Sequence, residues 1–235
     1  MKQERIKEVI AYYNEIVGNV EARAQEEELR AYGGLIRSEK GSLVERIGKA
    51  LVRIAWEDVL KQESDRLKFL SRKFKIPMKI EYIDRIEDPE LKNYIRKNLN
   101  KFYYEYKPDI SVAIDGVIVM FFECKSYTEN AMFKRILVDF TLLKTIFPTA
   151  KFFLLQLESQ LGGDFSKLGS KTYGSPQTHT LLSYFDIDIE IVTLLKGERK
   201  VDKPIHKPKF FKPLTKKALL NAITKISEAL KPWQK

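Results

Sequence analysis

The sequence predicts an α/β protein built around one central β-sheet, and two observations support this. Segments with the apolar spacing of helices alternate with short, mostly apolar segments that are typical of strands. Two of these apolar segments are joined by Asp115-Gly116, a dipeptide that favours a tight hairpin turn. With 235 residues, of which 44% are hydrophobic and 31% charged, the chain can form one folded domain.

The first half of the chain predicts four helices or strands before the hairpin. Residues 1–31 are expected to be helical, and Ser42 with Glu45 has the spacing of a helix-capping box. That second helix covers residues 43–62, and a short strand covers residues 77–83. Asp88 and Pro89 predict the start of a helix that continues to residue 102. The hairpin strands themselves are expected at 107–114 and 117–125.

The second half continues the alternation. A helical pattern covers residues 130–147, and an apolar strand covers residues 150–159. Residues 160–181 are polar and rich in Gly and Ser, which favours a long loop. A strand at 186–195 carries acids at alternate positions, as an edge strand can. A connector of Pro, Lys and aromatic residues then leads to a closing helix at 215–230.

Charged side chains stand at one end of the predicted hairpin. Side chains alternate along a strand, so Glu123 and Lys125 face one side and Cys124 faces the other. Asp109 lies six residues before the Asp115-Gly116 turn and Glu123 lies seven residues after it. Their positions are therefore within one residue of being opposite. The sequence predicts that two carboxylates and an ammonium group converge there.

This combination is typical of a metal-dependent phosphodiesterase site. Two close carboxylates repel unless a cation intervenes, and Mg²⁺ prefers oxygen ligands from carboxylates and substrate phosphate. A lysine beside the metal can orient the attacking water or neutralise phosphate charge. The alternative is a structural ion pair of Glu123 with Lys125 and an unrelated Asp109, although burying such charges without function is costly. Because Glu-x-Lys occurs four times in the sequence, only its place on the hairpin is informative.

Pro108-Asp109, followed 14 positions later by Glu123-Cys124-Lys125, resembles the motif of the PD-(D/E)XK nuclease superfamily. The resemblance implies a restriction-endonuclease-like core, with a central mixed β-sheet flanked by helices. It also implies that Asp109, Glu123 and the backbone carbonyl of Cys124 bind one or two Mg²⁺ ions, for which Mn²⁺ can substitute, while Lys125 acts on the water. An acid on the preceding helix often completes such sites. Glu45 matches that position better than Glu57, although a mere capping role for Glu45 stays open.

The net charge of +10 is concentrated near the C-terminal end. Residues 196–235 hold 12 basic and 3 acidic residues, a net of +9. A nucleic acid partner fits this distribution, and a lysine-rich tail that aids solubility is the alternative. We expect DNA contacts from the polar loop, from the Gly-rich turn before Ser42 and from the basic connector. The candidate DNA-binding residues are Arg37, Lys40, Lys167, Lys171, Tyr173, Gln177, His179, Lys207 and Lys209.

Other classes of protein are disfavoured. One cysteine permits no internal disulfide and no cysteine-rich zinc site, and two histidines are few for a histidine-based metal nuclease. The sequence has no phosphate-binding loop of the ATP-using kind, and no apolar run approaches the ~20 residues of a membrane-spanning helix. Its N-terminus lacks the apolar core of a secretion signal. We therefore expect a cytoplasmic protein that uses neither ATP nor a membrane.

Taken together, these patterns favour a Mg²⁺-dependent endonuclease for double-stranded DNA, most like a type II restriction enzyme. Residues 1–235 would form a single nuclease domain, with an N-terminal helical element (1–41), a catalytic core (42–160) and a DNA-recognition loop, further strand and basic helix (161–235). The resemblance implies products with 5′-phosphate ends, and cutting a palindrome requires a homodimer. The alternatives are a Holliday-junction resolvase or DNA-repair nuclease of the same fold and, in another class, a non-catalytic DNA-binding protein.

Overall fold

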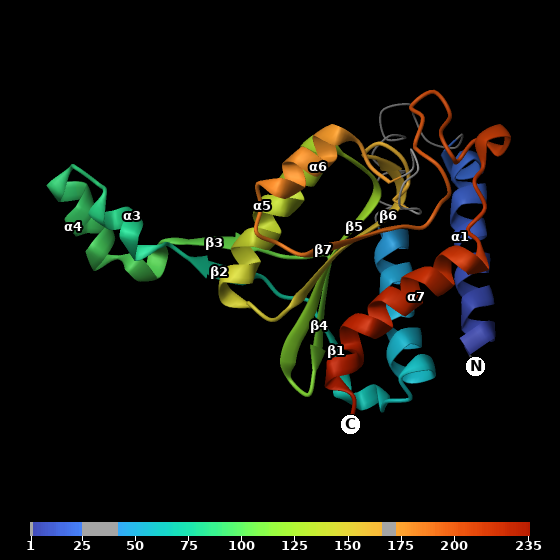
Figure 1. The fold of residues 1–235 in the computed structure, drawn as a ribbon, viewed down its shortest axis with the longest axis horizontal. Coiled ribbons are helices and arrows are strands. Elements are labelled where there is room, and N and C mark those ends of the chain that lie inside the picture. The colour runs from blue at the N-terminus through green and yellow to red at the C-terminus, as the bar shows by residue number, and fades with distance from the viewer. Residues whose placement is uncertain (1, 25–41, 166–172) are drawn as a thin grey trace.

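The computed structural model describes residues 2–24, 42–165 and 173–235, and Figure 1 shows helices on both sides of a twisted sheet. The helices are α1 (Lys2–Ala24), a helix over residues 42–53, its π-helical continuation η1 (Ile54–Val59), α3 (Ile80–Asp84), α4 (Pro89–Lys97), α5 (Asn130–Ile146), α6 (Pro176–Ser183) and α7 (Lys216–Leu230). The strands are β1 (Leu67–Leu70), β2 (Phe74–Pro77), β3 (Tyr103–Tyr106), β4 (Ile110–Ile114), β5 (Val117–Glu129), β6 (Lys151–Gln160) and β7 (Ile189–Thr193). Short 3₁₀ turns cover Ser64–Arg66, Leu99–Lys101, Pro208–Phe210 and Lys231–Trp233.

The central sheet has five strands in the order β1-β4-β5-β6-β7. β1, β4 and β5 pair antiparallel, whereas β5, β6 and β7 pair parallel. The predicted class, a mixed sheet flanked by helices, is therefore confirmed. β7 lies at one edge, in agreement with the alternate acids of its sequence. β1 lies at the other edge and is not predicted by any sequence pattern.

Helices cover both faces of this sheet and create two apolar cores. α1, the helix of residues 42–53 and α7 supply one core, and α5 supplies the other together with β2 and β3. Because side chains alternate along β5, Phe122 and Cys124 enter the first core and Phe121 enters the second. Glu123 and Lys125 consequently lie on the α5 side of the sheet. The buried residues around them hold these two polar positions on a rigid strand.

The region before the hairpin differs from its prediction. The predicted strand 77–83 is wrong beyond its first residue, because β2 ends at Pro77 and residues 80–84 form helix α3. The helical turn buries Ile83 while Ile80 and Tyr82 stay exposed. In the sequence, the apolar residues at 80 and 82 have the spacing of a strand. The predicted strand 107–114 begins only at residue 110, because residues 103–106 form the separate strand β3, which pairs with β2.

Local signals fixed several other boundaries. Asp88 caps α4, as predicted, by accepting the backbone N–H groups of Glu90 and Leu91 at 2.8 and 3.2 Å, although α4 ends earlier than residue 102. The helix at 130–147 and the strand at 150–159 are confirmed to within one residue at each end. The expected loop 160–181 is wrong in its last part, where α6 begins at Pro176 behind a Ser175 cap.

The hairpin turn is the predicted one. Asp115 and Gly116 have φ values of 49° and 85°, and two successive positive values are what a type I′ turn requires. Arg66 holds the Asp115 carboxylate through its Nε and Nη2 atoms at 3.0 and 2.9 Å. Within residues 2–24, 42–165 and 173–235, no helix combines the length and the apolar character needed to cross a membrane.

Candidate active site

Asp109, Glu123 and Lys125 meet at the end of the β4–β5 hairpin. The Lys125 Nζ lies 2.9 Å from Asp109 Oδ2 and also donates to Glu123 Oε2. Asp109 Oδ2 accepts the backbone N–H of Cys124 as well, at 2.7 Å. Glu123 is buried, whereas the side chains of Asp109 and Lys125 remain 26% and 27% exposed. The ammonium group is thus shared, and Asp109 belongs to the same cluster as the Glu123–Lys125 pair.

A β-bulge in β5 creates the register that this cluster needs. Ala113 pairs with Ile118, but the preceding residue, Val112, pairs with Met120. Val119 is therefore an extra residue in β5. Val119 and Met120 both face the core beneath α1 and α7, which is the local disturbance that a bulge produces.

The bulge decides which side chains stand beside Asp109. Continuing the shifted register by one pair beyond Ile110 and Phe122 places Asp109 opposite Glu123. Without the extra residue, Asp109 would stand opposite Phe122, whose side chain enters the core on the other face. The two carboxylates consequently share one face because β5 contains one residue more than the tight turn alone would require.

Tyr106 is a further member of the cluster that the sequence did not indicate. Its hydroxyl donates to Glu123 Oε1, so Glu123 is held from both sides, by Tyr106 and by Lys125. Two residues earlier on the same strand, the Tyr104 hydroxyl donates to Asp139 Oδ1 of α5 at 3.1 Å. Tyr104 and Tyr106 of β3 thus each donate a hydroxyl hydrogen bond to a carboxylate. The signal in the sequence is Tyr-x-Tyr placed just before Asp109.

The pKa values in this cluster follow from burial and from the shared charges. Burial raises the pKa of Glu123 and Asp109 raises it further, although Lys125 and Tyr106 act in the opposite direction. Burial alone would lower the pKa of Lys125, but the charges of Glu123 and Asp109 raise it above its ordinary value. Lys125 is therefore an ammonium donor at neutral pH. Burial and Glu123 raise the pKa of Tyr106, so its hydroxyl keeps its proton.

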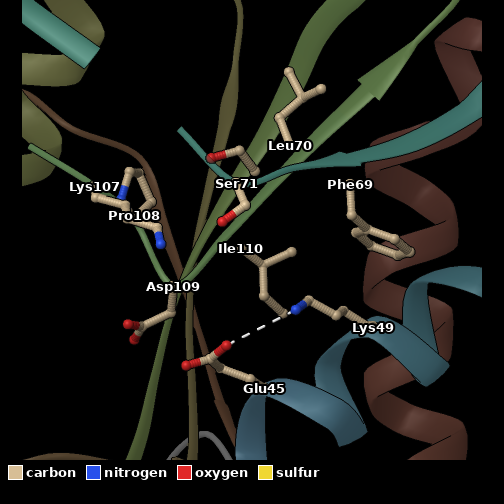
Figure 2. A pocket seen from close by; sticks show the side chains of 10 residues that line it. Glu45, Lys49, Phe69, Leu70, Ser71, Lys107, Pro108, Asp109 and Ile110 are labelled. Atoms are coloured by element: carbon tan, nitrogen blue, oxygen red, sulfur yellow. Dashed lines mark ion pairs between the residues drawn. The ribbon is translucent and has the colours of Figure 1, made fainter. Parts of the chain in front are cut away.

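A pocket of about 240 Å³ opens on one side of Asp109, and Glu45 and Lys49 of the helix 42–53 contribute to its wall. Figure 2 shows the Glu45 and Asp109 carboxylates reaching the same space from the helix and from the start of β4, with Lys49 paired to Glu45 at 3.8 Å. Burial raises the pKa of Glu45, and the charge of Asp109 adds to this. Glu57, the rival candidate, lies in η1 and instead forms an ion pair with Arg5 of α1 at 2.7 Å. Of the two, Glu45 is the one that shares a pocket with Asp109.

A second pocket, of about 250 Å³, lies on the α5 side of Asp109. Glu123, Lys125 and Tyr106 line it together with Asp139 of α5. Burial raises the pKa of Asp139, whereas the hydrogen bond from Tyr104 lowers it. Asp139 escaped the sequence analysis because it is the single acid of a helix that was recognised only by the spacing of its apolar residues. The cluster therefore borders one pocket on each side of Asp109.

The oxygen donors of the cluster suit a hard divalent cation. Among the described residues, no three His, Cys, Asp or Glu side chains form a preassembled metal cage. Mg²⁺ does not need one, because one or two protein carboxylates, waters and a substrate phosphate commonly suffice. Asp109 and Glu123 supply two carboxylates. In a strand, the N–H and C=O groups of one residue point toward the same neighbouring strand. Because the Cys124 N–H donates to Asp109, the Cys124 carbonyl also points toward Asp109.

Five of the nine candidate DNA-binding residues lie within the described part of the chain. Arg37, Lys40, Lys167 and Lys171 fall outside the described residues. Tyr173 and His179 are exposed and stack on each other, with ring centroids 5.6 Å apart. Gln177, on the adjacent α6, accepts a hydrogen bond from Asn130 at 3.3 Å.

The remaining two candidates, Lys207 and Lys209, are also exposed, on the connector before α7. None of these five described residues lines either pocket beside Asp109. Their part in DNA binding therefore stays a prediction.

Comparison with known proteins gives one close relative. The type II restriction enzyme DdeI of Desulfomicrobium norvegicum is 47% identical to this chain over 231 residues, which is 97% of this chain and 96% of the relative. No protein-family model matches the chain. Among solved structures, the native BbvCI A2B2 tetramer aligns with all of this chain and 90% of its own, at 13% identity and a TM-score of 0.39.

Proposed function

This chain belongs to the type II restriction enzymes and is thus a site-specific deoxyribonuclease, and we propose that its Asp109, Glu123 and Lys125 cluster carries out the cleavage. The reaction is Mg²⁺-dependent hydrolysis of both strands of double-stranded DNA, with 5′-phosphate and 3′-hydroxyl ends as products. The observation that supports this most strongly is the Lys125 ammonium group, which bonds to both carboxylates at the open end of the hairpin. A purely structural ion pair would need neither the second carboxylate nor two adjoining pockets.

Asp109, Glu123 and the Cys124 carbonyl would hold the metal, with Glu45 as a further ligand from the helix 42–53. When bound, Mg²⁺ supplies a water of lowered pKa and positive charge against the phosphate under attack. One or two ions are consistent with these donors, and Mn²⁺ would serve as a substitute. The Glu45 and Asp109 carboxylates face one pocket, and the charge of Asp109 contributes to the raised pKa of Glu45. A cation in this pocket would stabilise both carboxylates.

Lys125 acts as a proton donor in hydrogen bonds and as a positive charge. Its raised pKa keeps it protonated, so it orients the water and neutralises charge on the phosphate, and it does not take a proton from the water in this state. Its bonds to Asp109 and Glu123 fix the position of the ammonium group. Tyr106 fixes Glu123 in turn, because its hydroxyl occupies Oε1 and leaves Oε2 facing Lys125.

Sequence recognition is assigned to other parts of the chain. The exposed Tyr173, Gln177 and His179 would contact bases or backbone near α6, and Lys207 and Lys209 would contact phosphates. Two strands related by two-fold symmetry need two active sites, so the enzyme would act as a homodimer on a palindrome. An enzyme that acts on DNA would work in the cytoplasm, and hydrolysis with bound Mg²⁺ would need no ATP. Family membership favours restriction over the resolvase and repair alternatives.

The test is cleavage of several long DNA molecules with Mg²⁺, followed by sequencing of the fragment ends. Discrete fragments that share an end sequence and carry 5′-phosphates are expected, and chelation of the metal should stop the reaction. Lys125→Ala should abolish cleavage. Lys200→Ala, which removes the lysine of another Glu-x-Lys in an exposed segment, is the matched control and should cut at low salt. Cutting confined to branched DNA, or full activity of Lys125→Ala, would contradict the proposal.

A further inference from the structure

Residues 78–102 form a tip that stands away from the rest of the molecule. The two strands β2 and β3 carry this tip, and Figure 1 shows α3 and α4 projecting beyond the sheet at their end. Ile83 and Ile95, with exposures of 1% and 4%, form its interior, yet neither belongs to the two cores of the body. The tip is therefore a small folded unit whose outer surface receives no cover from the body.

That outer surface is unusually apolar. Five of the 14 large apolar side chains that are exposed in the described part of the chain lie within the tip, and two more lie on β3 beside it. On α4, Leu91 and Tyr94 are 47% and 57% exposed and lie three residues apart, so they share one face of the helix. Large contiguous apolar patches are rare on soluble monomers, and those that occur commonly mark a binding surface.

The charges of the tip are divided along the sequence, and Arg96 of α4 also pairs with Asp84 of α3 at 2.9 Å. Residues 81–90 contain five carboxylates and one arginine, whereas residues 91–101 contain four basic residues and no acid. On the Tyr94 side of α4, Glu90 stands toward the acidic end and Lys97 stands seven residues later at the basic end. The helix thus presents an acid, an aromatic ring and a base in a row, with Tyr94 near the middle.

This arrangement is complementary to itself. A two-fold interface places the same patch of two copies face to face, so one half of the patch must match the other half. Two antiparallel α4 helices that cross near Tyr94 would bring Glu90 of one copy to Lys97 of the other, twice. DNA fits less well, because the carboxylates at 81–90, of which Asp84 is paired with Arg96, would repel phosphate at that end of the patch. We propose that the tip is the docking surface for the tip of a second copy of this chain, with the two α4 helices antiparallel.

The need for two copies rests on the proposed function, whereas the choice of surface rests on the residues of the tip. The surface also has a connection to the active site, because β3 leaves the tip and carries Tyr106 to Glu123. A tip fixed by a second copy would anchor the strand at the end remote from Glu123. Assembly and the alignment of a catalytic carboxylate would then depend on the same strand.

The first test measures the dimer dissociation constant of the full chain by sedimentation equilibrium. Tyr94→Asp should raise this constant about tenfold or more, as loss of a central aromatic contact commonly does. Tyr184→Asp is the matched control, because Tyr184 is 81% exposed, lies just after α6 and should leave the constant unchanged. Circular dichroism of each variant should match the parent.

A charge exchange tests the antiparallel arrangement itself. Glu90→Lys and Lys97→Glu should each weaken the dimer, because each creates like charges across the two-fold axis. The double variant Glu90→Lys/Lys97→Glu should recover the parental constant to within a few-fold. A double variant as weak as the sum of its two single changes would overturn the antiparallel pairing.

The remaining outcomes separate the surface from the nuclease proposal. A dimer that Tyr94→Asp leaves intact, in a chain that cuts DNA, would overturn the tip interface and leave the proposed function standing. Tip variants that keep the parental mass but bind DNA more weakly, with a shallower salt dependence, would show a DNA contact and would also overturn it. A parent that stays monomeric both alone and on DNA would contradict the docking surface and the homodimer together.

Discussion

Gly48 is the position where the helix 42–53 comes closest to the strands that carry the active site. A Cβ atom added there would lie 2.7 Å from Ile110 Cδ1 and 3.0 Å from Leu155 Cδ2, well inside the ordinary carbon contact of about 3.5–4.0 Å. Both side chains are only 1% exposed and lie in the core, so neither can swing into solvent. Gly48→Ala must therefore push the helix and the sheet apart.

Two effects of opposite sign decide the size of the change. Alanine stabilises a helix interior by about 1 kcal/mol relative to glycine. Overpacking of a core costs about 1–3 kcal/mol, so Gly48→Ala should be destabilising by about 1 kcal/mol on balance. Gly18→Ala in α1 is the matched control, because nothing lies within 4 Å of the added atom. It should gain close to the full 1 kcal/mol.

Thermal unfolding measures the change in stability, and a cleavage assay measures the change in catalytic rate. For a chain of this size, 1 kcal/mol corresponds to a Tm change of about 2–4 °C, upward for Gly18→Ala and downward for Gly48→Ala. Because Glu45 lies one turn before Gly48, the displaced helix should also slow cleavage, by up to about 100-fold for a shift near 1 Å. A Gly48→Ala variant as stabilised as Gly18→Ala, and fully active, would refute this packing argument.

Three further predictions concern single contacts. Tyr106→Phe removes a hydrogen bond that lowers the pKa of Glu123, so the acid side of the pH–rate profile should move to higher pH. Cleavage below neutral pH should fall roughly tenfold. Superimposable pH–rate profiles of the parent and the variant would count against this role of Tyr106. Glu45→Gln should slow cleavage at least about tenfold, whereas Glu57→Gln, which loses only its ion pair with Arg5, should cut like the parent; equal rates for the two would remove Glu45 from the site. Asp115 has a pKa lowered to about 2 by hydrogen bonds from Arg66 and then Lys235, so its stabilising effect is present above the unfolded value of 3.8 and is lost as the pH falls toward 2. The Tm difference between the parent and Asp115→Asn should therefore be largest above about pH 5 and close toward pH 2, and a constant difference would contradict this sign.

The sequence was sufficient to predict the hairpin and the cluster at its end. Asp115-Gly116 determines a two-residue turn, and simple counting from that turn brings Asp109 and Glu123 within one residue of each other. The last step depends on the bulge at Val119, which lies within an unbroken apolar run. Nothing in such a run marks an extra residue, because after the exposed Val117 every side chain up to Phe122 is buried on one face or the other. The class of the site was therefore predictable, but its exact register was not.

Contacts between distant segments were the other gap. Tyr106 reaches Glu123 only because residues 103–106 form a strand of their own with β2, and the predicted strand at 77–83 excluded that pairing. The tip between β2 and β3 was missed for the same reason. By contrast, the start of α6 carried a readable local signal, Ser175-Pro176, since the Ser175 hydroxyl accepts the Thr178 N–H at 3.1 Å. Local capping is visible in a sequence, whereas strand partners across 30 residues are set by tertiary packing.

The most direct test of the proposed site is Asp109→Asn, with DNA binding and single-turnover cleavage measured on the same preparation. The Asp109 carboxylate accepts hydrogen bonds from Lys125 and from the Cys124 N–H, and it lines both pockets. Replacing it with asparagine therefore removes a charge from the cluster with little change of shape. We predict site-specific binding within a few-fold of the parent and cleavage reduced at least about 1,000-fold, which corresponds to about 4 kcal/mol of lost transition-state stabilisation. Cleavage within tenfold of the parent at saturating Mg²⁺ would contradict a metal site at the end of this hairpin.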